Sequence, residues 1–205
     1  MRPGEVIDGR FVVERFIARG GMGEVYRALD RETQRPVALK RMSADDELLA
    51  ERFQLESRAL LELDHPAIVR YVAHGEAPGV GRYLVMEWLE GVTLSGWLRQ
   101  HSLSLDQTLR LAQRVAEGLG AAHQRGMLHR DIKPGNLFLV GRRVEWAKIL
   151  DFGLVRNPLQ DITVTGAGMG TPEYMSPEQA RADRKLGPST DVFALGGVIY
   201  RCITG

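Results

Sequence analysis

Hydrophobic and polar positions alternate along the first part of the chain in short runs that are rich in β-branched and aromatic residues. This pattern is typical of strands, and segments containing glycine or proline separate the runs. Residues 46–63 instead carry apolar side chains at helical spacing. The pattern therefore predicts a small α+β unit of five strands and one helix, with the strands at residues 11–17, 24–28, 35–40, 68–73 and 82–87.

The second part of the chain has mainly helical spacing. Ser104 and Gln107 have the sequence pattern of a capping box, and apolar residues follow at helical spacing up to Gly126, a candidate C-cap. A second long helix is expected to start after Ser189 and to end near Thr204.

The change from strand to helix spacing indicates two lobes, with a boundary near residues 89–93. We expect a small lobe at residues 1–89 and a larger, mainly helical lobe at residues 90–205. The fold class is therefore α+β with two lobes.

Composition narrows the class of protein. Of 205 residues, 44% are hydrophobic and 26% charged, which is typical of a globular protein. The 27 basic and 26 acidic side chains nearly balance, which argues against a partner that is nucleic acid or an anionic membrane. Cys202 is the single cysteine, so no internal disulfide can form. The segment lacks an apolar run of membrane-spanning length and the apolar core of a signal peptide, so we expect a cytoplasmic setting, with a downstream span left open.

A glycine-rich turn lies between the first two expected strands and contains Gly20, Gly21 and Gly23. Glycines let backbone N–H groups approach phosphate oxygens, and Val25 would then cover a nucleotide base. Lys40 ends the third strand, and Glu56 on the following helix could hold its ammonium group. An ordinary hairpin and solvated charges would explain these residues equally well when each is taken alone.

A more specific cluster lies at residues 129–136. Asp131 can accept the proton of an attacking hydroxyl, and Lys133 can neutralise charge on a moving phosphoryl group. Asn136 and Asp151 carry oxygens that suit a divalent cation such as Mg²⁺. The order and spacing of these residues make a chance arrangement negligible.

With these motifs the chain resembles the eukaryotic-type protein kinase family, in its bacterial Ser/Thr branch. The resemblance covers residues 11–205 and implies the two-lobed protein kinase fold, with ATP bound by the first lobe. It implies transfer of the γ-phosphoryl group of Mg-ATP to Ser or Thr hydroxyls of proteins. The matching segments are the glycine-rich turn, Val37-Ala38-Leu39-Lys40, Glu56, His129 to Asn136, Asp151-Phe152-Gly153 and Gly170 to Glu178.

The resemblance also implies roles for single residues. Lys40 would bind the α- and β-phosphates and pair with Glu56, Asp131 would be the catalytic base, and Asn136 and Asp151 would hold two Mg²⁺ ions. Met86 would stand at the back of the adenine pocket. The rest of the nucleotide site would come from the glycine-rich turn and from Ile17, Val25, Ala38, Glu87, Leu89 and Phe138. A stack that joins the lobes would contain Leu60, Tyr71, Phe152 and His129, with Asp191 anchoring His129.

Three features indicate the substrate class and its control. Lys133 follows Asp131 by two residues, which is the pattern of the family's Ser/Thr enzymes. Thr171 lies where those enzymes contact the catalytic aspartate. Arg130 marks family members that are switched on by phosphorylation of the activation loop, here at Thr163 or Thr165. A transient dimer could carry out that autophosphorylation. Two unmodified loop threonines are the alternative.

The sequence departs from the family pattern at two places. Ala18 replaces the first glycine of the turn, which would narrow the allowed backbone if that position needs a positive φ. The chain stops at Gly205, so we expect a fragment in which Glu178 lacks its usual arginine and the last helix has an uncovered apolar face. These departures keep two alternatives open: a nucleotide-binding pseudokinase or scaffold, and a kinase of small molecules.

Overall fold

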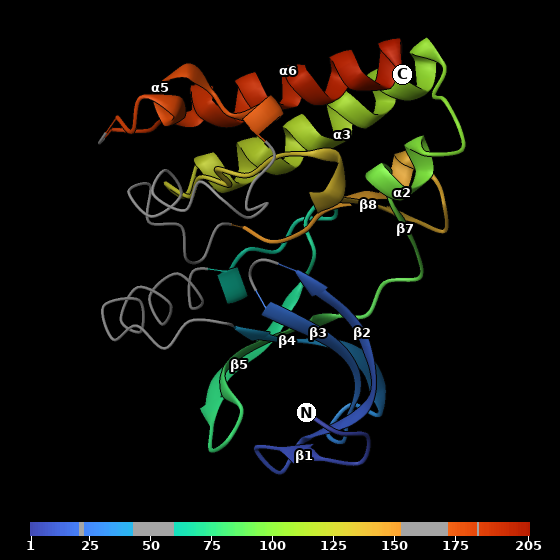
Figure 1. The fold of residues 1–205 in the computed structure, drawn as a ribbon, viewed down its shortest axis with the longest axis vertical. Helices are drawn as coiled ribbons and strands as arrows, with labels where there is room; N and C mark the ends of the chain where they lie inside the picture. The colour runs from blue at the N-terminus through green and yellow to red at the C-terminus, as the bar shows by residue number, and fades with distance from the viewer. Residues whose placement is uncertain (21–22, 43–59, 153–171, 184) are drawn as a thin grey trace. The chain divides into compact units, whose positions relative to one another are not determined.

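The computed structural model describes residues 1–205 except 21–22, 43–59, 153–171 and 184 (Figure 1). The chain divides into two compact units, one made of Met1–Asp64 and Arg70–Leu89, the other of His65–Val69 and Glu90–Gly205. Most of the helix expected at residues 46–63 lies outside the described residues. None of the helices that are described is both long and apolar enough to cross a membrane.

The first unit is built on a six-stranded antiparallel sheet with the order β1-β2-β3-β4-β6-β5 (Figure 1). The five expected strands are present, and the two-residue β1 is an addition that pairs with the start of β2. Two residues are too few to show an alternating pattern, so β1 could not be predicted from the sequence. The strands are β1 Val6–Ile7, β2 Phe11–Gly20, β3 Gly23–Asp30, β4 Arg35–Met42, β5 Tyr71–Ala77 and β6 Gly81–Glu87.

The register of this sheet separates two sets of side chains. Tyr26, Leu39 and Val85 lie opposite one another on β3, β4 and β6, and they belong to a hydrophobic core on one face. Neighbouring residues of a strand point to opposite faces, so the residues directly before and after these three on their strands lie on the other face of the sheet. Other core members on the first face are Ile7, Phe11, Val13, Ala28, Val37 and Tyr83.

A buried carboxylate fixes the turn between β3 and β4. Asp30 has no exposed surface and accepts two hydrogen bonds from the Arg10 guanidinium, both at 2.8 Å. The Glu32 amide (3.1 Å) and the Thr33 hydroxyl (3.0 Å) also donate to it. The Arg10 hydrogen bonds are the main cause that lowers the pKa of Asp30 to about 2, from an ordinary 3.8.

This lowered pKa predicts a contribution to stability that depends on pH. A carboxyl group whose folded pKa is depressed stabilises the protein above its unfolded pKa, and the benefit is lost as the pH falls. We expect the free energy of unfolding to lose about 2 kcal/mol from this site between about pH 4 and pH 2. Urea unfolding of wild type and Asp30→Asn across that range measures the difference. Asp106→Asn, at an exposed carboxylate on another element, is the control, and equal pH slopes for all three proteins would contradict the assignment.

The second unit combines helices with a small sheet. Its two long helices, α3 and α6, lie side by side (Figure 1). The strands form a three-stranded sheet in the order β7-β8-β9. The elements are β7 Gly91–Thr93, α2 Leu94–Leu98, α3 Leu105–His123, β8 Leu137–Val140, β9 Ala147–Ile149, α5 Pro177–Ala180 and α6 Pro188–Thr204, with 3₁₀ turns η1 Pro134–Asn136, η2 Val144–Trp146 and η3 Pro172–Tyr174.

The expected start of α3 is confirmed in detail. The Ser104 amide donates to Gln107 Oε1 (2.9 Å), and the Gln107 amide donates to Ser104 Oγ (3.2 Å). These reciprocal bonds satisfy two N–H groups that a helix start otherwise leaves unpaired. Gly126 follows the helix with a φ of 72°, as a residue after a helix C-terminus often does.

The strand expected at residues 68–73 starts later, at Tyr71. Residues His65–Val69 belong to the second unit, where they run beside β9. The Ile149 amide donates to the Ala67 carbonyl (2.8 Å), and the Val69 amide donates to the Ile149 carbonyl (3.0 Å). The backbone of this segment is thus bonded to β9. The alternation of its side chains does not reveal this, so the predicted start of the strand was too early.

One side of α6 carries large apolar side chains that remain exposed. Tyr200 is 70% exposed and Val192 61%, whereas Val198 and Cys202 are buried. Phe193 and Ile203 are also exposed. The expected uncovered apolar face of the last helix is therefore present in this structure.

Candidate active site

Four residues expected at the nucleotide site share one face of the sheet in the first unit. Val25 lies opposite Lys40, and Ala38 lies opposite Met86. Lys40 and Ala38 are two residues apart on β4, so their side chains point to the same face. This face is the one opposite the hydrophobic core. Lys40 and Met86 are each only 6% exposed, so the ammonium group of Lys40 lies within the fold and not at a solvated strand end.

The end of β6 is fixed by a reciprocal pair of hydrogen bonds. The Glu87 amide donates to the Arg70 carbonyl (2.9 Å), and the Arg70 amide donates to Glu87 Oε1 (2.8 Å). These two bonds hold the backbone of Glu87 in place. Leu89 follows shortly after and is half-buried. Ile17, another residue expected at the nucleotide site, lies on β2 beside a bulge and is 36% exposed.

Several expected site residues are not part of this geometry. Phe138 lies on β8 in the second unit, opposite Thr93 and Lys148. The remaining residues lie outside the described part of the chain: Gly21, Glu56, Thr163, Thr165 and Thr171.

The glycine-rich turn closes a β-hairpin in which Gly20 pairs with Gly23. Ala18 lies inside β2 opposite Val25, and its φ is not positive. The backbone at Ala18 therefore does not require glycine, and the methyl group causes no strain there. Gly23 is different: its φ is 130°, and a Cβ at this position would overlap the Arg41 carbonyl oxygen of β4.

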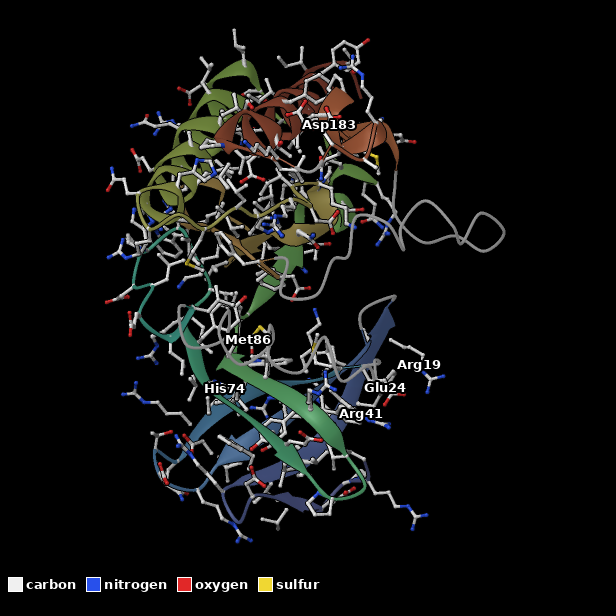
Figure 2. The ribbon with its side chains drawn as sticks, turned by 90° about the vertical axis from the view of Figure 1, so that its left-hand side faces the viewer. Arg19, Glu24, Arg41, His74, Met86 and Asp183 are labelled. Atoms are coloured by element: carbon white, nitrogen blue, oxygen red, sulfur yellow. The ribbon has the colours of Figure 1, made fainter. Side chains whose placement is uncertain are left out.

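A charged cluster ties this hairpin to β4 on the core side of the sheet. Figure 2 shows Arg19, Glu24 and Arg41 gathered at the same end of the hairpin. Glu24 forms ion pairs with Arg19 and with Arg41 (3.4 Å), and it accepts a hydrogen bond from the Tyr26 hydroxyl (2.8 Å). The bonds from Tyr26 and Arg19 lower the pKa of Glu24 to about 2. Glu24 thus stays ionised and links three strands next to the turn.

The two glycines should respond differently to alanine. Gly23→Ala places a Cβ against the β4 backbone at a positive φ, so we expect a loss of about 2 kcal/mol or more in stability. Gly20→Ala meets no atom within 4 Å and should change stability by less than about 0.5 kcal/mol. Urea midpoints of the two variants measure both values. Equal midpoints would show that the close approach to β4 does not constrain the turn.

In the second unit, the loop before η1 is held by Asp191 of α6. This carboxylate has no exposed surface and accepts hydrogen bonds from the amides of His129 (2.9 Å) and Arg130 (2.7 Å). The ring of His123, at the end of α3, lies 2.7 Å from Asp191 Oδ2. The expected anchoring of His129 by Asp191 is confirmed. The contact to His123 was not expected, because nothing in the sequence relates the end of α3 to the start of α6.

The buried ring of His129 links this loop to the end of β9. Its Nδ1 accepts from the Asp131 amide (3.1 Å), and its Nε2 lies 2.7 Å from the Leu150 carbonyl. Burial lowers the pKa of His129, so the ring is neutral with its proton on Nε2, which donates to Leu150. The ring also packs against Phe152, with centroids 4.8 Å apart.

Asp131 is held between two neighbours of the same loop. Lys133 Nζ lies 2.9 Å from Asp131 Oδ2, and Asn136 Nδ2 donates to the same oxygen at 3.0 Å. The Asn136 amide nitrogen also donates to the Asp131 carbonyl (2.8 Å). The carboxylate of Asp131 is thereby oriented by a cation and an amide.

The same contacts show which atoms could hold a metal ion. Because the amide nitrogen of Asn136 is engaged with Asp131, its Oδ1 is the atom left to bind a cation. The Leu150 amide, directly before Asp151 in the chain, donates to the Asn136 carbonyl (2.8 Å). Asp151 has a φ of 52°, an unusual value for a residue other than glycine. One carboxylate and one amide oxygen fit Mg²⁺, which keeps most of its ligands for phosphate and water.

A short helix, α5, is hydrogen-bonded both to α6 and to the loop that carries Asp131. The Thr190 hydroxyl of α6 donates to Glu178 Oε1 (2.8 Å), so Glu178, which we expected to lack its usual arginine, has a hydroxyl partner. The Gln179 side chain donates to the Arg130 carbonyl (2.9 Å). The family resemblance singles out Glu178 but not Gln179. Ser176 and Gln179 nevertheless repeat the capping-box pattern of α3.

Comparison with known proteins identifies the class. Residues 11–205 match the family model described as "Protein kinase domain", which covers nearly the whole chain. The chain therefore belongs to the protein kinase family, and it has the protein kinase fold.

Curated relatives and solved structures agree with this assignment. Serine/threonine-protein kinase pkn2 of Myxococcus xanthus is 41% identical, over 98% of this chain and 25% of that protein. Serine/threonine-protein kinase PknA of Mycobacterium tuberculosis is 38% identical over 100% of this chain and 49% of that protein. The crystal structure of the M. tuberculosis PknI kinase domain matches with a TM-score of 0.81 and 27% identity, over 98% of this chain and 75% of that one. The chain thus spans between a quarter and a half of these two curated relatives.

Proposed function

We propose that this chain is the catalytic part of a Ser/Thr protein kinase, which transfers the γ-phosphoryl group of Mg-ATP to Ser or Thr hydroxyls of proteins. The observation that carries the proposal is the carboxylate of Asp131, oriented by Lys133 and Asn136, with the residue before Asp151 bonded to the Asn136 backbone. We assign ATP binding to residues 1–89 and catalysis to residues 90–205. The relatives named Ser/Thr kinases support the substrate class.

In the proposed reaction Asp131 accepts the proton of the attacking hydroxyl as the new bond to phosphorus forms. Lys133 would donate to the oxygens of the phosphoryl group as the bond from its phosphorus to the leaving ADP oxygen breaks, which the place of Lys133, 2.9 Å from Asp131, supports. Lys40 would bind the α- and β-phosphates, and its place opposite Val25, on the same sheet face as Ala38, supports this role. Val25, Ala38 and Met86, on the same face, would contact the adenine.

The metal ligands in this proposal are Asn136 Oδ1 and the Asp151 carboxylate. When bound, Mg²⁺ neutralises charge on the phosphate oxygens. The role of the chain is to orient these two oxygen ligands, and the backbone bond between Leu150 and Asn136 supports it.

Control by phosphorylation is a further part of the proposal. Arg130 Nε is buried and, among the described residues, has no hydrogen-bond partner. A guanidinium nitrogen in that state favours a phosphate as partner, supplied by Thr163 or Thr165. Thr171 would contact Asp131, the proposed catalytic base. Transient dimers would carry out the autophosphorylation in a cytoplasmic compartment that supplies ATP.

The test is transfer of label from γ-labelled ATP, with Mg²⁺, to a generic protein substrate rich in Ser and Thr. We expect labelled protein, and labelled kinase as well. Binding of ATP seen as a thermal shift, with no transfer, would instead identify a nucleotide-binding scaffold. Transfer to a small hydroxylated compound with none to protein would identify a small-molecule kinase.

A further inference from the structure

Both ends of the Gln179 side-chain amide are engaged, and each end serves a different element. Its Oε1 accepts from the Ser176 amide (3.2 Å), which completes the capping box at the start of α5. Its Nε2 donates to the backbone carbonyl of Arg130 (2.9 Å), 49 residues earlier in the chain. The first bond is an ordinary helix cap, but the second joins α5 to the residue directly before Asp131.

The residue that receives this bond has an unfavourable backbone conformation. Arg130 has a φ of 65°, in the left-handed region that costs free energy for a residue with a long side chain. Such a conformation persists only where neighbours hold it in place. On the amide side of Arg130, Asp191 accepts its N–H at 2.7 Å. On the carbonyl side, Gln179 donates at 2.9 Å.

The two holding residues are themselves connected. Glu178, next to Gln179, accepts a hydrogen bond from Thr190, next to Asp191. The contacts therefore form a closed ring from the Arg130 amide through α6 and α5 back to the Arg130 carbonyl. Because the carbonyl of Arg130 and the amide of Asp131 belong to one peptide plane, fixing this carbonyl also fixes where the Asp131 side chain starts.

We infer that Gln179 is a positioning residue for Asp131, acting through the Arg130–Asp131 peptide. This inference rests on the proposed kinase function. It assigns to α5 a direct share in orienting the catalytic base, in addition to the cap of its own helix.

The chain offers a matched control for separating the two roles. Gln107 has the same place in the capping box of α3, where its Oε1 accepts from Ser104, and α3 carries no corresponding bond to Arg130. Replacement of either glutamine by glutamate keeps an oxygen for the cap but removes the amide donor. Replacement by methionine removes both and adds no charge.

We expect kcat in the full chain to fall about fivefold to tenfold in both Gln179→Glu and Gln179→Met, the cost of one lost hydrogen bond to a constrained peptide. The KM for ATP should change by less than about twofold, since the base and not the nucleotide is displaced. Gln107→Glu and Gln107→Met should keep the wild-type kcat. A Gln179→Glu protein with wild-type kcat would overturn the inference and leave Gln179 as a helix cap.

The pH dependence gives a readout that a merely structural role would not move. A protonated glutamate has one O–H donor and one acceptor oxygen, so it can reproduce both bonds of Gln179. The kcat of Gln179→Glu, divided by that of wild type at the same pH, should therefore rise as the pH is lowered. The same ratio for Gln179→Met should stay constant, and a constant ratio in both would contradict the role of the donor.

A failure of the proposed function would be recognised separately. If wild type transfers no phosphoryl group, the kinase proposal fails while the role of Gln179 can still be measured by amide hydrogen exchange of residues 129–132. Faster exchange in Gln179→Met than in Gln107→Met supports the inference, and equal exchange overturns it.

Discussion

Asp131→Asn should abolish most of the phosphoryl transfer while leaving the fold unchanged. The asparagine keeps the shape of the side chain and an oxygen that can still accept from Asn136, but it cannot take the proton of the attacking hydroxyl. General bases contribute about 10²- to 10⁴-fold, so we expect kcat to fall within that range. The measurement is the initial rate of transfer from γ-labelled ATP to a peptide, with the thermal midpoint measured alongside.

The control for this loss of charge is Asp183→Asn. Asp183 is exposed and lies in the loop after α5 (Figure 2). We expect its rate to equal that of wild type. Equal rates for Asp131→Asn and wild type would remove Asp131 from the chemistry.

Asp191→Ala should reduce both stability and activity. The substitution leaves the buried amide of His129 and the half-buried amide of Arg130 without this acceptor, and it removes the partner of the His123 ring. Each unsatisfied buried group costs about 1–3 kcal/mol, so we expect a loss of about 3 kcal/mol or more in the free energy of unfolding. The positive φ of Arg130 also loses one of its two supports, and kcat should fall by about tenfold or more.

Urea unfolding and transfer rates measure these two effects. Thr190→Val is the matched control on the same helix, because it removes one buried hydroxyl bond, to Glu178, without exposing the loop amides. It should cost about 1 kcal/mol. An Asp191→Ala protein as stable as Thr190→Val would show that the amides find other acceptors.

The sequence predicts much of the fold because its signals are local. The cap at Ser104 and Gln107 and the alternation that places Val25 and Lys40 on one face depend only on nearby residues and on strand geometry. The meeting of Asp131, Lys133 and Asn136 also follows from the sequence, because the three residues occur within a few positions of one another.

Other features depend on contacts between distant parts of the chain. The approach of His123 to Asp191 requires α3 and α6 to pack side by side, which no local pattern encodes. The positive φ of Arg130 has no signal in residue type, since glycine would be the expected residue there. Gln179 had the pattern of a helix cap, but its bond to the Arg130 carbonyl depends on how the second unit folds.

The most direct test of the central claim is the identity of the labelled amino acid. Four peptides that differ only in a single acceptor position (Ser, Thr, Tyr or Ala) are incubated with the protein, Mg²⁺ and γ-labelled ATP. The account predicts phosphoserine and phosphothreonine, with little label on the Tyr peptide and none on the Ala peptide. Label on the Tyr peptide alone, or on no peptide while ATP binds, would contradict it.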